Sequence, residues 1–214
     1  MTLAGVWAGL GQRLGIASEL SDAVWREIET AYSEPHRHYH TLTHIAAVVA
    51  DWQQLHDRFE TPDSALLALV FHDVVYDPAR QDNEAVSAGV LRERLGGIDG
   101  LIMKQACFCI EETKHHKATG DADTDLVLDI DMAILGASWD DYLRYAENVA
   151  REYIPVYGLD AYTTGRSALF LEPTLAHDRL FLTDAFADRE AQARQNLVAE
   201  RDLWRSGAFA ERFK

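Results

Sequence analysis

The sequence predicts an all-α fold of about nine or ten helices, arranged as a single domain over residues 1–214. Apolar residues recur at spacings of three and four along most of the chain, which is the period of an amphipathic helix. Capping residues, glycines and prolines mark where these segments begin and end. No neighbouring pair of segments alternates as two strands would, and 214 residues with 48% hydrophobic content can bury one sizeable core.

The expected helices follow from this periodicity and from their capping signals. Residues 65–76 are ambiguous, because 66–71 is apolar throughout and fits a buried strand as well as a buried helix. Thr61 followed by Pro62 is typical of a helix N-terminus and favours the helix, which should lie in the core. We expect helices over residues 3–15, from Ser18 to before Pro35, from Thr41 or Thr43 to about 59, and over 62–76, 82–95, 98–116, 126–135, 138–153, 159–172 and 183–205.

The net charge and the cysteine content indicate which binding partners and which cellular compartment to expect. A net charge of −15 repels nucleic acid and anionic lipid, so we expect neither a nucleic acid polymer nor a membrane as partner. No apolar run is long enough to cross a membrane, and residues 1–15 lack the features of a signal peptide. Cys107 and Cys109 lie two positions apart on a helix and are poorly placed to pair, so two free thiols in a reducing cytoplasm are expected.

Histidine is concentrated in residues 33–44, which hold four of the nine histidines of the chain. Histidine is the commonest metal ligand among side chains and titrates near neutral pH. His44 lies one turn before Val48 on an apolar stripe, so it should face inward. A second signal is the apolar run 66–71, which ends abruptly in His72 and Asp73. Both stretches are expected to contribute to one metal centre.

Three acidic residues, Asp73, Asp129 and Asp131, lie within apolar helical runs. A buried carboxylate is costly unless it is paired or binds a metal. A buried His-Asp pair alone is more often a structural hydrogen-bonded pair, but the inward-facing His44 and Asp131 strengthen the metal interpretation. Two histidines and two carboxylates suit a divalent ion with open positions for water, and the absence of cysteine disfavours a structural zinc site.

The order His44, His72-Asp73, Asp131, all on helices, resembles the HD superfamily of metal-dependent phosphohydrolases. Residues 39–44 also resemble the tyrosine-histidine-x-x-x-histidine motif of the related cyclic-nucleotide phosphodiesterases. Residues 33–40, 71–77, 82–84 and 129–136 are similar to a bacterial family of predicted metal-dependent HD phosphohydrolases, with a weaker likeness over 140–202. The resemblance implies an HD-type helical bundle, with core motifs in 33–136 and C-terminal helices in 138–207.

The same resemblance implies the ligands His44, His72, Asp73 and Asp131, with Asp129 as the rival for the last position. They would bind one divalent ion, which can be Mn, Mg, Co, Ni, Fe or Zn. Binuclear HD enzymes and the HD-type di-iron oxygenases carry two further, well-separated histidines before the last aspartate. Here that interval holds only the adjacent pair at 115 and 116, which favours a single metal and disfavours oxygenase chemistry.

The resemblance further implies roles for residues near the ligands. Asp73 would orient a metal-bound water. By analogy with the phosphodiesterases, His40 would donate a proton to the leaving oxygen, although it fits an ordinary surface loop histidine equally well. Glu84 and Asp77 would hydrogen-bond the ligands or act as bases, although both also fit ordinary solvated helix starts. The candidates for neutralising a bound phosphate are Arg37, Lys114 and His116, of which the last two equally suit a helix C-terminus.

Together these observations predict hydrolysis of a phosphate ester by a metal-bound water, with a nucleotide or a small phosphomonoester as the substrate. A non-catalytic helical module that binds a metal or a nucleotide is the first alternative. A structural helical protein with a buried polar cluster is the second. The state of assembly is left open, with a homodimer among the candidates.

Overall fold

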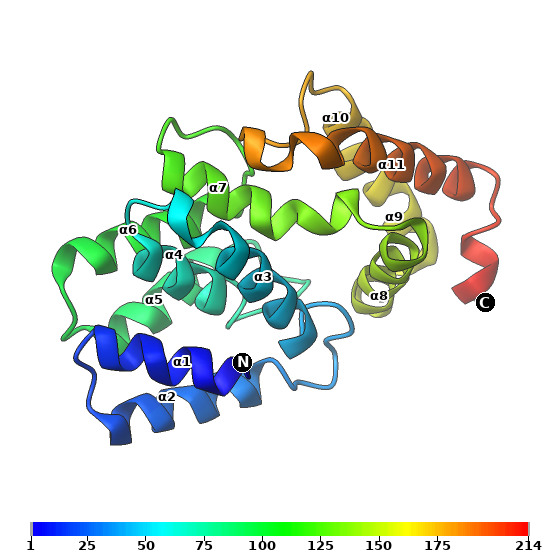
Figure 1. Ribbon diagram of the computed structural model, residues 1–214. Helices are drawn as coiled ribbons and strands as arrows, with labels where there is room; N and C mark the ends of the chain where they lie inside the picture. Colours follow the sequence, from blue (N-terminus) through cyan, green and yellow to red (C-terminus); the bar gives the residue numbers. More distant parts are fainter. Residues whose placement is uncertain (1, 214) are drawn as a thin grey trace. The chain divides into compact units, whose positions relative to one another are not determined.

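The computed structural model describes residues 2–213, and this part of the chain is built from helices joined by short loops, with no strand (Figure 1). The predicted all-α fold is therefore confirmed. Contacts within the chain divide it into two compact units, Met1–Asp131 and Met132–Lys214. The expectation of one domain over residues 1–214 stays a prediction.

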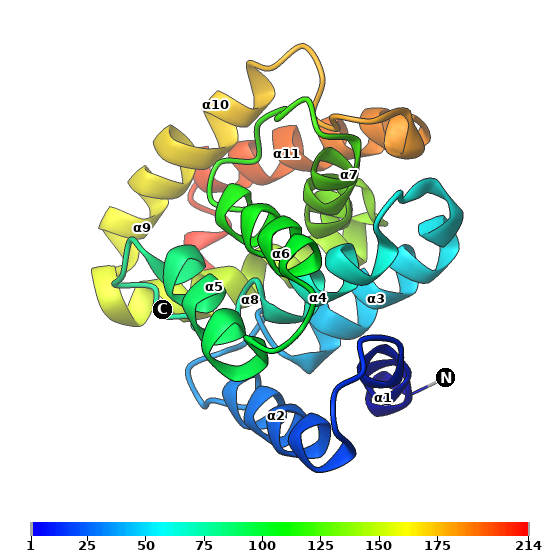
Figure 2. The ribbon, with the colours of Figure 1, turned by 90° about the vertical axis from the view of Figure 1, so that its left-hand side faces the viewer.

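The first unit is organised around one central helix, α4. Every residue from Ser64 to Phe71 is buried, as expected for a helix that is apolar on all sides. It packs against α3, α5, α6 and α7, and Figure 2 shows these helices around it. The helices of this unit are α1 (Leu3–Arg13), α2 (Ser18–Ala31), α3 (Leu42–Leu55), α4 (Pro62–Phe71), α5 (Asn83–Leu95), α6 (Gly100–Glu112) and α7 (Ala122–Asp131).

Helices α4 and α7 are parallel and have the same length, 10 residues each. At their N-terminal ends, the carboxylate of Asp123 accepts hydrogen bonds from the backbone N–H groups of Glu60 and Thr61, at 2.9 and 2.6 Å. At their C-terminal ends, His72 and Asp131 contact one another. Thr61 precedes Pro62 as predicted, but its hydroxyl donates to Asp123 instead of capping its own helix. The register of the two helices is therefore held at both ends.

Helix α4 ends at Phe71, earlier than the predicted position near residue 76. The backbone beyond it finds partners outside the helix. Arg37 donates to the carbonyl oxygens of Asp73 and Val74, at 2.7 and 3.2 Å. The hydroxyl of Ser87 accepts from the N–H group of Val75 at 3.1 Å. Because these groups are already paired, the chain needs no further helical turn to satisfy them.

Other predicted helix boundaries shift by a few residues. Ala17, not Ser18, is the N-cap of α2, and α3 ends at Leu55 before a short 3-10 turn (His56–Arg58). Helix α6 begins at Gly100, because the side chain of Asp99 accepts hydrogen bonds from the N–H groups of Leu101 and Ile102. It ends at Glu112, before the predicted end at residue 116, and α7 begins at Ala122, before the predicted start at residue 126.

In the second unit, Ser138 caps α8 as predicted, by accepting from the N–H group of Asp141 at 3.3 Å. The unit encloses an ion pair between Arg166 and Glu200, with N–O distances of 2.9 and 3.0 Å. Tyr142 and Trp204 also donate to the Glu200 carboxylate. The elements here are a 3-10 turn (Met132–Gly136), α8 (Trp139–Tyr157), α9 (Leu159–Gly165), a π-helical segment (Arg166–Leu171), α10 (Glu172–Leu175), a 3-10 turn (Asp184–Arg189), α11 (Glu190–Arg205) and a last 3-10 turn (Ala210–Phe213).

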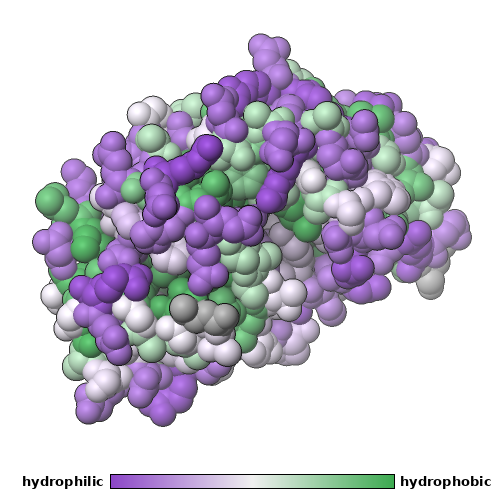
Figure 3. Space-filling view, in the orientation of Figure 1, coloured by the Kyte–Doolittle hydropathy of each residue, from purple (hydrophilic) through white to green (hydrophobic). Residues whose placement is uncertain are grey.

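Hydrophilic side chains cover most of the face drawn in Figure 3, with smaller hydrophobic patches between them. Among residues 2–213, none of the helices combines the length and the apolar character that a membrane span requires.

Candidate metal centre

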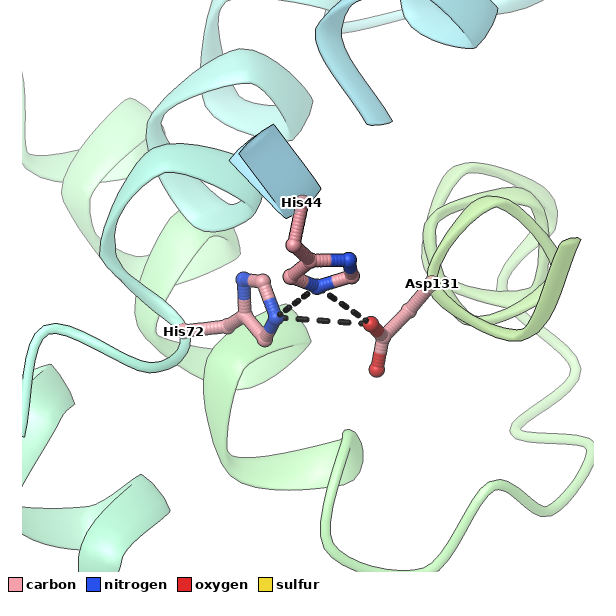
Figure 4. A group of neighbouring side chains, drawn as sticks. All are labelled: His44, His72 and Asp131. Carbon is pink, nitrogen blue, oxygen red and sulfur yellow. Dashed lines mark hydrogen bonds and ion pairs between the residues drawn. The ribbon is translucent and has the colours of Figure 1, made fainter. Parts of the chain in front are cut away.

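Three side chains from three helices of the first unit meet at one point (Figure 4). His44 lies in the first turn of α3, His72 is the C-cap of α4, and Asp131 is the last residue of α7. The Nε2 atoms of the two histidines are 3.1 Å apart. Oδ1 of Asp131 lies 3.2 Å from Nε2 of His44 and 3.3 Å from Nε2 of His72. These three atoms form a nearly equilateral triangle, here called the ligand triangle.

The size of the ligand triangle can be compared with the bond lengths of a metal ion. An ion about 2.1 Å from each of the three atoms would sit about 1 Å above their plane, with bond angles of about 100°. Such angles lie between those of tetrahedral and octahedral coordination. The three residues therefore fit one face of a divalent ion and would leave its opposite face open.

Local hydrogen bonds orient both histidine side chains toward the ligand triangle. The Thr41 side chain accepts from the N–H group of Thr43 at 3.3 Å, which fixes the start of α3 and turns His44 inward as predicted. Nδ1 of His72 lies 2.9 Å from the backbone oxygen of Leu69. A carbonyl oxygen only accepts, so Nδ1 carries the proton, and Nε2 of neutral His72 presents its lone pair to the triangle.

Asp73 lies beside the triangle. Its Oδ2 is 2.9 Å from Nε2 of His72, but Asp73 is outside the group whose ligand atoms all lie within 4.8 Å of one another. Nε2 of His40 lies 3.9 Å from the same Oδ2, and the His40 ring stacks on Tyr76 with centroids 4.1 Å apart. The His40 side chain is 18% exposed, so it can contact both Asp73 and solvent.

Burial and the two carboxylates set the charges of the histidines. Burial lowers the pKa of His44, although Asp131 beside it acts in the opposite direction. Burial also disfavours the charged form of His72, but Asp73 and Asp131 outweigh this and raise its pKa well above the ordinary value. The site therefore favours a positive charge between two carboxylates.

The carboxylates show the complementary shifts. Burial raises the pKa of Asp131, but His72 and the hydrogen bonds from His116 and His44 outweigh it, so the pKa lies well below the ordinary value. At Asp73, burial raises the pKa of the carboxyl group and His72 lowers it. The effect of His72 prevails, so the pKa of Asp73 is also lowered. The C-terminal ends of α4 and α7, which carry partial negative charge, meet here as well. The electrostatics of the site thus suit a cation.

The structure distinguishes between the two candidates for the last ligand. Asp131 belongs to the ligand triangle, whereas Asp129 is buried but lies outside that group. Two positions along a helix correspond to a turn of about 200°, so the two side chains point to nearly opposite faces of α7.

The surroundings of Arg37 differ from those expected for a residue that contacts a bound phosphate. Its side chain is fully buried, and its donors bind the backbone oxygens of His40, Asp73 and Val74 and the carboxylate of Glu34. These contacts favour a structural role, in which Arg37 holds the turn that carries the His-Asp pair.

The remaining candidate residues differ in whether they contact the ligand triangle. Asp77 is exposed and accepts from the N–H group of Ala79 at 2.8 Å, which shapes its own loop. Lys114 donates to the backbone oxygen of Gln81. Within residues 2–213, no hydrogen bond or ion pair joins Lys114 or Glu84 to the triangle. His116 does reach it, because its Nε2 lies 3.0 Å from Oδ2 of Asp131.

Reasoning from the sequence missed one contributor, Tyr32, and assigned a different role to another, His116. The hydroxyl of Tyr32 donates to the backbone oxygen of Val70 at 3.0 Å and accepts from the N–H group of Asp73 at 3.3 Å. Tyr32 carries no sequence signal beyond its helical spacing, although a buried tyrosine usually needs a partner for its hydroxyl. The resemblance implies a phosphate contact for His116, and nothing in its neighbours along the chain indicates a contact with Asp131.

No protein-family model, curated protein or solved structure matches the chain in the comparisons with known proteins.

Proposed function

We propose that this protein is a metal-dependent phosphohydrolase of the HD type that hydrolyses a small phosphate ester with one divalent ion. The ligand triangle of His44, His72 and Asp131 is the observation that supports this most directly. The sequence resemblance to HD phosphohydrolases supports the reaction class. Mn, Fe, Co, Ni and Zn suit two imidazoles better than Mg does, which prefers oxygen ligands.

A bound divalent ion supplies a nucleophile near neutral pH by lowering the pKa of a coordinated water. His44, His72 and Asp131 would hold the ion, and Asp73 would be the fourth ligand or the group that orients the water. His40 is partly exposed beside Asp73 and donates a proton to the leaving oxygen. Its ring is held for this task by stacking on Tyr76.

The substrate proposed here is a nucleotide or a small phosphomonoester. The strongly acidic chain, with a net charge of −15, argues against a polyanionic polymer. Both cysteines are buried and free, which fits the proposed cytoplasmic location.

Metal analysis followed by an activity screen tests the proposal. The purified protein is loaded with Mn²⁺, Co²⁺, Ni²⁺ or Mg²⁺ and assayed against nucleotides and sugar phosphates. We expect one ion per chain and turnover of at least one substrate class. His72→Ala should lose both metal and turnover, and Asp73→Asn should lose turnover. His56→Ala is the matched control, because His56 is exposed and its ring contacts Asp57 and Trp52, neither of which belongs to the ligand triangle.

Full turnover by metal-free His72→Ala would contradict the mechanism. Metal binding together with tight nucleotide binding, but without turnover for any substrate, would instead identify a non-catalytic binding module.

A further inference from the structure

The geometry points to His116 as a positioning residue that holds the Asp131 carboxylate in its metal-binding orientation. This inference rests on the metal centre proposed above and assigns a further residue to it.

The two oxygens of Asp131 have different partners. Oδ1 faces the two histidines of the ligand triangle, at 3.2 and 3.3 Å. Oδ2 faces Nε2 of His116, at 3.0 Å. A hydrogen bond to the outer oxygen restricts rotation of the carboxylate, so Oδ1 stays directed at the ion position. His116 thereby acts on the ion through Asp131.

The backbone of His116 supports this assignment. Its φ of 46° lies in the left-handed region, and it is the one non-glycine residue of positive φ in the described chain. A position just beyond a helix end with such a backbone is usually glycine. A side chain that persists there indicates a constraint from its surroundings, and such strain is often found at functional sites. Here the constraint is the imidazole contact with Asp131.

His115 provides the comparison within the same loop. It is exposed, and its backbone N–H donates to the oxygen of Glu112 at 3.0 Å, while that of His116 donates to the same oxygen at 3.2 Å. Both residues therefore share the same helix-terminal turn. Only the side chain of His116 reaches the ligand triangle.

Three variants test the inference. His116→Gly removes the imidazole and suits the left-handed backbone, so it should fold. His116→Gln restores an N–H donor at about the reach of Nε2 and keeps a side chain of similar length. His115→Gly is the matched control in the same turn. The measurements are the dissociation constant for Co²⁺, the visible absorption spectrum of the Co²⁺ protein, and the melting temperature without metal.

We expect His116→Gly to bind Co²⁺ about 10–100-fold more weakly than the wild type, as is typical when the partner of a metal ligand is lost. Its Co²⁺ spectrum should change, while its metal-free melting temperature stays equal to or above that of the wild type. His116→Gln should recover most of the affinity, and His115→Gly should behave as the wild type.

Co²⁺ affinity and spectrum in His116→Gly equal to those of His115→Gly would overturn the inference and leave the proposed metal centre intact. A lower melting temperature in His116→Gly, with no recovery of affinity in His116→Gln, would show a structural role instead. Absence of Co²⁺ binding by the wild type would remove the metal centre, and the inference with it.

Discussion

Nδ1 of His72 donates a hydrogen bond to the backbone oxygen of Leu69, 2.9 Å away. The ring is therefore oriented before any ion arrives, and the folded chain needs little rearrangement to bind one. An ion that binds only the folded state stabilises it, by about 2.7 kcal/mol at a free concentration of one hundred times the dissociation constant. We expect the melting temperature to rise with added Co²⁺ or Mn²⁺ and to fall again after chelation.

Thermal unfolding monitored by circular dichroism measures this shift. His72→Ala should show no metal-dependent change, and His56→Ala should shift as the wild type does. An identical metal-dependent shift in His72→Ala would place the binding site elsewhere.

The two aspartates at the end of α7 should respond differently to loss of charge. Asp131→Asn should abolish stoichiometric metal binding, because Asp131 supplies one corner of the ligand triangle. Asp129→Asn should keep the metal and lose stability instead, because Asp129 is buried. Metal content by elemental analysis and urea unfolding separate the two effects, and the reverse pattern would make Asp129 the ligand.

Arg37→Lys should destabilise the protein by about 1–3 kcal/mol, because a single ammonium group cannot replace all the donors that now satisfy buried backbone oxygens. Metal affinity should fall as well, since Asp73 lies in the turn that Arg37 holds. Urea unfolding and Co²⁺ titration measure both effects. If Arg37 contacted phosphate instead, the substitution would raise KM and leave the unfolding midpoint unchanged.

Removing one partner of the Arg166–Glu200 pair should be more harmful than removing both. Glu200→Gln leaves the buried guanidinium without its counter-charge and should cost about 3–5 kcal/mol. The double change Arg166→Met with Glu200→Gln should cost less, since neither charge then remains buried and the amide oxygen still accepts from a neighbouring donor of Tyr142 or Trp204. Urea unfolding at neutral pH measures the difference. A double variant less stable than Glu200→Gln would contradict this.

The same pair predicts a loss of stability in acid. Burial raises the pKa of Glu200, but Arg166 and the hydrogen bonds to the carboxylate outweigh it and hold the pKa below the ordinary value of 4.5. A carboxyl group whose pKa is lowered by folding stabilises the folded state above its ordinary pKa. That contribution is lost as the pH falls from about 4.5 through the folded-state value.

Urea unfolding between pH 7 and pH 3 tests the acid prediction. The wild type should lose more stability over this range than the double variant Arg166→Met with Glu200→Gln. Equal losses would assign the acid sensitivity to other carboxylates.

Much of the fold and of the candidate site could be predicted from periodicity and from breaks in it. His44 and Asp131 are polar residues in apolar helical runs, and a period of 3.6 residues places them on inner faces. Their meeting with His72 agrees with the expectation drawn from the sequence.

Other features depend on contacts between distant segments. Helix α4 stops at Phe71 because Arg37, far earlier in the chain, takes up the backbone oxygens that follow. His116 contacts Asp131 from a left-handed backbone position after α6, which helical periodicity does not predict. Asp73 is adjacent to His72 in the chain, and its Oδ2 lies close to Nε2 of His72, but it lies in the turn beyond α4, so helical periodicity could not place it relative to the triangle.

The equal lengths of α4 and α7, joined through Asp123 at one end and through the His72–Asp131 contact at the other, make the site sensitive to insertions. One residue added inside either helix would advance everything after it by about 1.5 Å and rotate it by about 100°. That rotation would turn the following ligand away from its partners. Evolutionary variation in length should therefore be confined to the loops, while the spacing from Thr61 to His72 and from Asp123 to Asp131 is preserved.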